Sequence, residues 1–194
     1  ESVQEAANRV LEEATGLKNV YMEELKTYTA IKRDSGYRAI SIGQYALICI
    51  NDYDKDLVEK YNAYWYPFNE LPALVLDHNQ MVLDAMERLK QKARYQPIGL
   101  ELLSEKFTLP ELQSLYEAIY QRKMDSRNFR KKVLSFKVLI KTDEKDKTAS
   151  KKGAFYYKFD YDKYKHTIGG WKCTANNGYN NKRRNEYKYI GYRG

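Results

Sequence analysis

The start of the chain carries a cluster of side chains that could take part in phosphate chemistry. Glu1, Glu12 and Glu13 supply carboxylates, and Arg9 supplies a guanidinium, all within one short segment. Carboxylate oxygens are the ligands that Mg²⁺ prefers, and a bound metal can activate water against a diphosphate. This segment is therefore the first candidate for a hydrolytic site.

A helix must position these side chains, and the sequence marks both of its ends. Ser2 and Glu5 have the spacing of a capping box, in which each side chain accepts a hydrogen bond from a free backbone N–H of the first turn. Gly16 ends the helix because glycine enters the left-handed conformation without steric cost. The apolar residues between these ends recur at helical spacing and make one apolar stripe: Val3, Ala6, Ala7, Val10, Leu11 and Ala14.

Residues 9–17 resemble the end of a Nudix box, the helix on which Nudix hydrolases hold Mg²⁺. In this alignment Val10 and Ala14 stand where the family has glutamates, while Glu13 remains. One carboxylate holds a hydrated Mg²⁺ poorly, so the resemblance predicts no catalytic residue, no metal and no cofactor. The alternative is a Nudix hydrolase with relocated carboxylates, which would need Mg²⁺. The remnants of the box are Glu1, Arg9, Glu12 and Glu13.

The remainder of the first half fits the same resemblance. Residues 20–31, 38–50 and 63–66 are rich in β-prone side chains and predict strands. Residues 65–72 resemble a stretch found late in many Nudix-like domains. The leading glycine of the box would lie before residue 1, so we expect a Nudix-like α/β/α sandwich over residues 1–95 that lacks its N-terminal strands. A second amphipathic helix closes it, with an apolar face of Val82, Ala85, Met86, Leu89 and Ala93.

The net charge of +8 is concentrated in the second half of the chain. Residues 1–95 carry 12 basic and 15 acidic side chains, whereas residues 96–194 carry 22 and 11. A split of this size predicts two modules with different partners, and the basic module is the candidate to bind a phosphate backbone.

The basic half contains a second pattern of helices with readable ends. Thr108 and Glu111 form another capping box, and the apolar residues that follow predict a buried face of Leu109, Leu112, Leu115, Tyr116 and Ile119. Asp125 is a good N-cap for a helix over residues 126–136, in which Phe129, Val133 and Phe136 face inward. The outward face then carries the side chains expected to contact DNA, namely Ser126, Arg127, Asn128, Arg130 and Lys131.

Two β-prone segments, residues 138–141 and 154–159, follow this helix and predict a two-stranded wing. The loop between them is expected to place four lysines on DNA: Lys145, Lys147, Lys151 and Lys152. A short helix is predicted at residues 100–104, which completes a winged helix–turn–helix domain over residues 96–166. Residues 167–194 are rich in Gly, Asn, Tyr and Lys, and we expect a disordered tail.

Residues 107–159 resemble the C-terminal winged helix of Nudix-related transcription regulators. Together with the degenerate box, the resemblance implies an α+β protein that binds double-stranded operator DNA as a homodimer and senses a small effector without being an enzyme. Residues 62–78 look closer to the sugar-sensing branch, so a repressor of sugar catabolism genes that responds to arabinose is the first reading. A regulator of NAD metabolism that senses ADP-ribose is the alternative. Trp65 is a candidate to line the effector pocket, with a core position as its alternative.

The hydropathy and the cysteine content of the chain limit the remaining classes of protein. No apolar stretch approaches the length of a membrane span, so no membrane partner is expected. Cys49 and Cys173 have no metal-ligand spacing, which predicts a reducing compartment and a cytoplasmic protein. A non-enzymatic module that binds protein through its basic half remains a competing interpretation.

Overall fold

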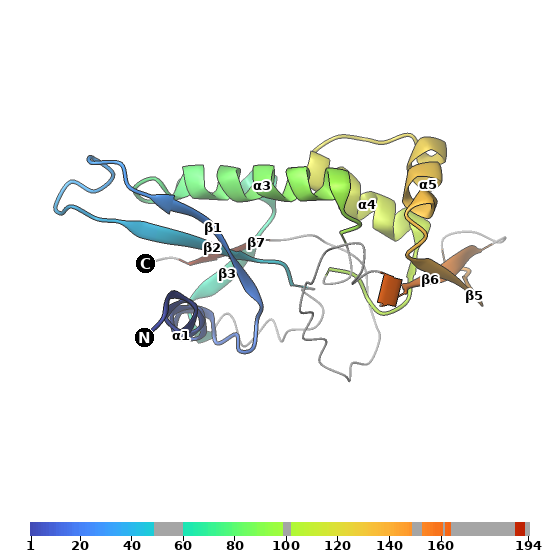
Figure 1. The fold of residues 1–194 in the computed structure, drawn as a ribbon, viewed down its shortest axis with the longest axis horizontal. Helices are drawn as coiled ribbons and strands as arrows, with labels where there is room; N and C mark the ends of the chain where they lie inside the picture. The colour runs from blue at the N-terminus through green and yellow to red at the C-terminus, as the bar shows by residue number, and fades with distance from the viewer. Residues whose placement is uncertain (49–59, 99–101, 149–152, 161, 164–188, 193–194) are drawn as a thin grey trace. The chain divides into compact units, whose positions relative to one another are not determined.

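The computed structural model describes residues 1–48, 60–98, 102–148, 153–160, 162–163 and 189–192. Helices and strands are mixed along the chain (Figure 1), which confirms the predicted α+β class. Their bounds are α1 Val3–Thr15, β1 Met22–Tyr28, β2 Ser41–Ala46, β3 Ala63–Tyr66, the 3-10 helix η2 Phe68–Glu70, α3 His78–Tyr95, β4 Phe107–Thr108, α4 Leu109–Tyr120, α5 Ser126–Ser135, β5 Leu139–Asp146, β6 Ala154–Phe159 and β7 Tyr189–Tyr192.

The chain divides into two compact units. The first comprises residues 1–88 and 186–194, and the second comprises residues 89–185. Helix α3 begins in the first unit and ends in the second. The domain boundary expected near residue 95 stays a prediction.

Helix α1 has the predicted ends. The Ser2 hydroxyl accepts from the Glu5 backbone N–H at 3.3 Å, and the Glu5 carboxylate accepts from the Ser2 N–H at 2.7 Å. Gly16 adopts φ 73°, and a side-chain carbon there would meet the Tyr61 ring at 2.5 Å, so only glycine fits this end of the helix.

The buried side of α1 is narrower than its apolar stripe. Ala7 and Leu11 pack against the core of the first unit. Val3 and Val10, however, are 47% and 53% exposed, so the apolar stripe is only partly buried. A helix that contacts its sheet along one line buries only the residues nearest that line, and these two valines lie beside it.

Strands β1 and β2 form an antiparallel hairpin that is shorter than the predicted strands. Leu25 is an unpaired bulge residue, since the register passes from Glu24 opposite Gln44 to Lys26 opposite Gly43. Residues 29–31 and 38–40, which the composition assigned to strands, form turns and irregular backbone instead.

The hairpin carries a helix on each side, as the predicted sandwich requires (Figure 1). On one side, the Tyr28 hydroxyl donates to Asp84 of α3 at 2.9 Å, and Lys26 Nζ lies 3.0 Å from the same carboxylate. On the other side, Met22 and Ala46 contribute to the core against which α1 packs. The buried members of this core are Leu17, Val20, Met22 and Ala63, and Ala7, Leu11, Ala46, Ile48 and Trp65 pack against them.

A buried ion pair attaches the hairpin to the start of α3. Arg33, whose side chain is 3% exposed, makes a two-pronged contact with Asp77 at 2.9 and 2.8 Å and also donates to the Ser41 hydroxyl. The hydrogen bond from Arg33 lowers the pKa of the Asp77 carboxyl. Since a guanidinium without its partner is costly to bury, this pair fixes the loop of residues 29–40 against the helix.

Strand β3 pairs antiparallel with β7, with Ala63 opposite Tyr192 and Tyr66 opposite Tyr189. Within the tail that was expected to be disordered, residues 189–192 form this strand. The other residues of the tail, 167–188 and 193–194, lie outside the described residues. The two strands are more than a hundred residues apart in the sequence. Pairing at such a separation gives no local signal in the composition, so the Gly- and Asn-rich tail did not indicate a strand.

The second unit combines two helices with a three-stranded sheet of order β4-β6-β5. The short helix predicted at residues 100–104 is wrong over residues 102–104, which form a turn, while residues 100–101 lie outside the described residues. So short a helix gains almost no backbone hydrogen bonds for the residues it fixes, and the adjacent strand β4 draws the chain into an extended form. No helix in the described ranges is long and apolar enough to cross a membrane.

Candidate nucleic-acid interface

Helix α4 is the packed support of the site. Its capping box is complete, because Thr108 accepts from the Glu111 N–H at 3.3 Å and Glu111 accepts from the Thr108 N–H at 2.7 Å. All five residues predicted for its inner face are buried, as are Phe107 and Phe159 of the sheet, whose ring centroids lie 5.0 Å apart. This core holds the N-terminus of α4 against strands β4 and β6.

Helix α5 begins where the sequence predicted. The Asp125 carboxylate accepts from the Asn128 N–H at 2.8 Å, and Phe129 and Val133 are buried. The Phe129 ring meets the Tyr116 ring of α4 edge-on, with 5.4 Å between centroids. Phe136, expected to be buried, is only half-buried because it caps the helix rather than lying within it.

The outer face of α5 gathers the five predicted side chains. All five are exposed and lie on this one helix, and Arg127 and Lys131 lie opposite the buried pair: Ser126, Arg127, Asn128, Arg130 and Lys131. Within the part of the chain that the structure describes, neither arginine nor Lys131 has an ion-pair partner. Three unneutralised cations on one turn and a half of helix form a surface that attracts a polyanion.

The turn between α4 and α5 is held by one carboxylate that sequence reasoning missed. Gln113 Nε2 and the Met124 backbone N–H both donate to Glu117 Oε1 at 3.0 Å, and Lys123 Nζ lies 2.9 Å from Oε2. These bonds, that from Gln113 first, lower the pKa of Glu117 from 4.5 to about 2. The i, i+4 spacing of Gln113 and Glu117 was the available signal. The carboxylate fixes the direction in which α5 leaves the turn.

We expect Glu117→Gln to lower the melting temperature at neutral pH, because the charged acceptor of the turn is lost. A carboxyl whose folded pKa is depressed stabilises the fold above its unfolded pKa, and that contribution disappears as the pH falls. The gap between wild type and variant should therefore close from about pH 5 toward pH 2. Thermal unfolding across this range is the measurement, with the exposed Glu105→Gln as the control. A gap that stays constant with pH would contradict this role for Glu117.

The wing differs from its prediction in one respect. Strand β5 extends beyond residue 141 to Asp146, so Lys145 lies within a strand and not in the loop. It is opposite Phe155 of β6, and pairing with that strand overrides the low β propensity of the intervening acidic residues. Lys147 follows the strand and is exposed, whereas Lys151 and Lys152 lie outside the described residues.

Phe155 brings a further lysine into the wing. The Nζ atoms of Lys141 and Lys145 lie 3.5 and 4.4 Å from the centre of the Phe155 ring. Both cations therefore lie against the Phe155 ring, which restricts their movement and retains their charge. Sequence reasoning did not include Lys141, although its place in a predicted strand beside an aromatic strand was visible.

The remnant of the Nudix box in the first unit forms ion pairs at the surface. Arg9 lies 2.5 Å from Glu1 and 3.2 Å from Glu13, while Lys18 lies 2.7 Å from Glu12. The described residues contain no group of three or more side chains able to hold a metal ion. Every remaining box carboxylate thus faces a cation of the protein, so the residues present do not fit a catalytic Mg²⁺.

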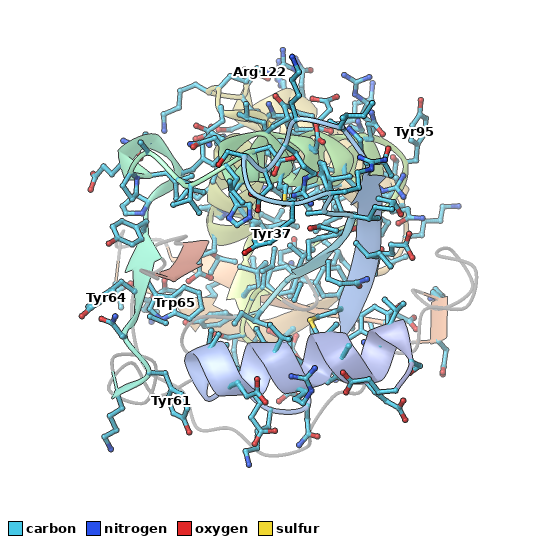
Figure 2. The ribbon with its side chains drawn as sticks, turned by 90° about the vertical axis from the view of Figure 1, so that its left-hand side faces the viewer. Tyr37, Tyr61, Tyr64, Trp65, Tyr95 and Arg122 are labelled. Carbon is cyan, nitrogen blue, oxygen red and sulfur yellow. The ribbon has the colours of Figure 1, made fainter. Side chains whose placement is uncertain are left out.

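Trp65, the candidate for an effector pocket, lies in β3 and packs against the core of the first unit. It is partly buried, and its ring points away from the side taken by Tyr64 (Figure 2). Its indole nitrogen is buried and has no hydrogen-bond partner among the described residues.

Comparisons with known proteins match both units. The model of the NrtR DNA-binding winged helix domain matches residues 99–159. The ADPR responsive transcriptional repressor NtrR of Acinetobacter baylyi is 31% identical over 161 residues, which cover 80% of this chain and 64% of that protein. The chain thus spans less than two thirds of that relative's length.

Two crystal structures of Shewanella oneidensis NrtR are also similar. The structure complexed with a 27mer DNA has a TM-score of 0.72 and 30% identity, and the match covers 84% of this chain and 75% of that chain. The second has a TM-score of 0.66 and 29% identity, with coverage of 84% and 76%. The winged-helix match and the identity to these regulators show that this chain belongs to the NrtR family of Nudix-related transcriptional regulators.

Proposed function

We propose that this chain is a sequence-specific DNA-binding repressor whose Nudix-like unit senses ADP-ribose and does not hydrolyse it. The observation that carries the DNA-binding part is the outer face of α5, where Arg127, Arg130 and Lys131 are exposed and have no ion-pair partner among the described residues. Arginine can make paired hydrogen bonds to guanine, whereas lysine meets phosphate. Asn128 and Ser126 are exposed on the same helix and add polar groups near the end that enters a major groove.

The wing extends the same surface. Lys141 and Lys145, supported by Phe155, together with Lys147 would neutralise backbone phosphates beside the groove. Lys151 and Lys152 stay predicted contacts. Each phosphate contact adds about 0.9 to the slope of log affinity against log salt, so a surface of this size makes binding strongly salt-dependent.

We assign ADP-ribose as the effector. The residue pattern put a sugar such as arabinose first, but nothing in the comparisons supports a sugar, and the curated relative is named as ADPR responsive. The ion pairs of Arg9 and Lys18 with the box carboxylates support a binding domain rather than a hydrolase. A homodimer remains a prediction of the family resemblance.

The test begins with duplexes that the purified chain selects from a random-sequence library. ADP-ribose added to the protein–DNA complex should weaken binding about 5- to 150-fold, the usual range of coupling between two sites. Arabinose and AMP at equal concentration should have little effect, and ADP-ribose should be recovered intact in the presence of Mg²⁺. Release by arabinose alone would overturn the effector, AMP production would restore the hydrolase reading, and failure to enrich any duplex would reject the repressor.

A further inference from the structure

Two buried polar atoms in the first unit lack a partner among the described residues, namely Nε1 of Trp65 and Oε1 of Gln44. Nearly all buried donors and acceptors in folded proteins are paired, because an unpaired one has lost its hydration without replacement. One atom is a donor and the other is an acceptor. A ligand that offers both kinds of group would satisfy the pair.

The strand register and the packing of the core relate Gln44 to Trp65. Gln44 and Ala46 lie on one face of β2, and Ala46 packs against the same core cluster as Trp65. Gln44 precedes Ala46 by two residues, so their Cα atoms are about 7 Å apart along the strand. Both unpartnered atoms therefore border the same core, on the side of the sheet where α1 lies.

This border opens to solvent beyond Gln44. Ile42, the next residue on the same face, is 41% exposed. Glu24, directly opposite Gln44, is also exposed and carries a carboxylate. The negative charge of Glu24 disfavours a phosphate at this position and can accept hydrogen bonds from hydroxyls.

We propose that Trp65 and Gln44 form the part of the effector site that binds a ribose. The indole N–H donates to one hydroxyl oxygen, and the Gln44 carbonyl accepts from a neighbouring hydroxyl, so a vicinal diol pairs both atoms at once. The diphosphate of the effector lies outside this position. The assignment rests on the proposed sensing of ADP-ribose, and it names the residues and the part of the ligand that meet.

The experiment measures ADP-ribose affinity by calorimetry for the 194-residue chain and for Trp65→Phe and Gln44→Leu. Each variant removes one hydrogen-bonding group and should weaken binding about three- to tenfold. Tyr64→Phe is the matched control, since it removes a hydroxyl on the other side of the same strand (Figure 2) and should bind as wild type. In a Trp171→Phe background, Trp65 is the only tryptophan, and its fluorescence should change on addition of ADP-ribose.

Thermal unfolding without ligand separates binding from stability. Gln44→Leu should melt no lower than wild type, because the atom that it removes has no partner among the described residues. Trp65→Phe should melt somewhat lower, because it also removes ring atoms that pack on the core. Equal ADP-ribose affinity in wild type and both variants would overturn this site and leave the proposed function intact. A lower melting temperature with unchanged affinity would make the residues purely structural. Absence of ADP-ribose binding in wild type would overturn the proposed effector and the site together.

Discussion

Replacing both Arg127 and Arg130 by alanine is expected to remove sequence-specific DNA binding while leaving the fold intact. Each arginine that pairs with a base contributes about 1–3 kcal/mol of discrimination, so the double variant should lose roughly 10²- to 10⁴-fold in affinity for its selected duplex. The helix should persist, because alanine is the best helix former and Phe129 and Val133 still anchor its inner face. Fluorescence anisotropy with labelled duplexes measures the loss.

A control must remove the same charge elsewhere in the second unit. Arg94 and Arg122 are exposed and lie off α5, so Arg94→Ala/Arg122→Ala changes the net charge equally. We expect this variant to weaken selected and scrambled duplexes alike, and only modestly. Equal losses in the two double variants would mean that bulk charge, not a recognition helix, accounts for binding.

Truncation of the Phe107 side chain is expected to cause a large loss of stability in the second unit. Phe107 is 1% exposed and packs on the Phe159 ring at the junction of β4 and α4. Phenylalanine-to-alanine changes in a core cost about 3–5 kcal/mol, and a small domain has only about 5–15 kcal/mol in total. Phe107→Ala should therefore unfold the second unit at low denaturant and abolish DNA binding.

The same variant should retain its ADP-ribose affinity, because the proposed effector residues belong to the first unit. Urea unfolding followed by circular dichroism gives the stability, and calorimetry gives the affinity. Phe107→Leu keeps most of the volume and should lose much less stability. Unchanged urea midpoints for both variants would show that this junction is not the core of the unit.

The helices α1, α4 and α5 were predictable because their signals are local. Capping boxes at Ser2 and Thr108, the N-cap at Asp125 and the glycine at position 16 all involve neighbouring residues, and all four are present in the structure. The exposed face of α5 followed directly from the spacing of Phe129 and Val133.

Features that depend on distant pairing could not be predicted in the same way. Strand β7 pairs with β3, and β5 extends by pairing with β6, so neither is encoded in its own composition. The Glu117 contacts require the turn to have folded already. The buried atoms of Gln44 and Trp65 that lack a hydrogen-bond partner among the described residues become visible only when the core around them is known.

The most direct test of the account is the binding of wild-type protein to a selected duplex and a scrambled duplex across a salt series. We predict at least about 10³-fold preference for the selected duplex at moderate salt, as for specific regulators. Binding to the scrambled duplex should fall steeply with salt, since phosphate contacts dominate it. Equal affinity for the two duplexes at every salt concentration would contradict sequence-specific recognition by α5, and salt-insensitive binding would contradict a basic DNA interface altogether.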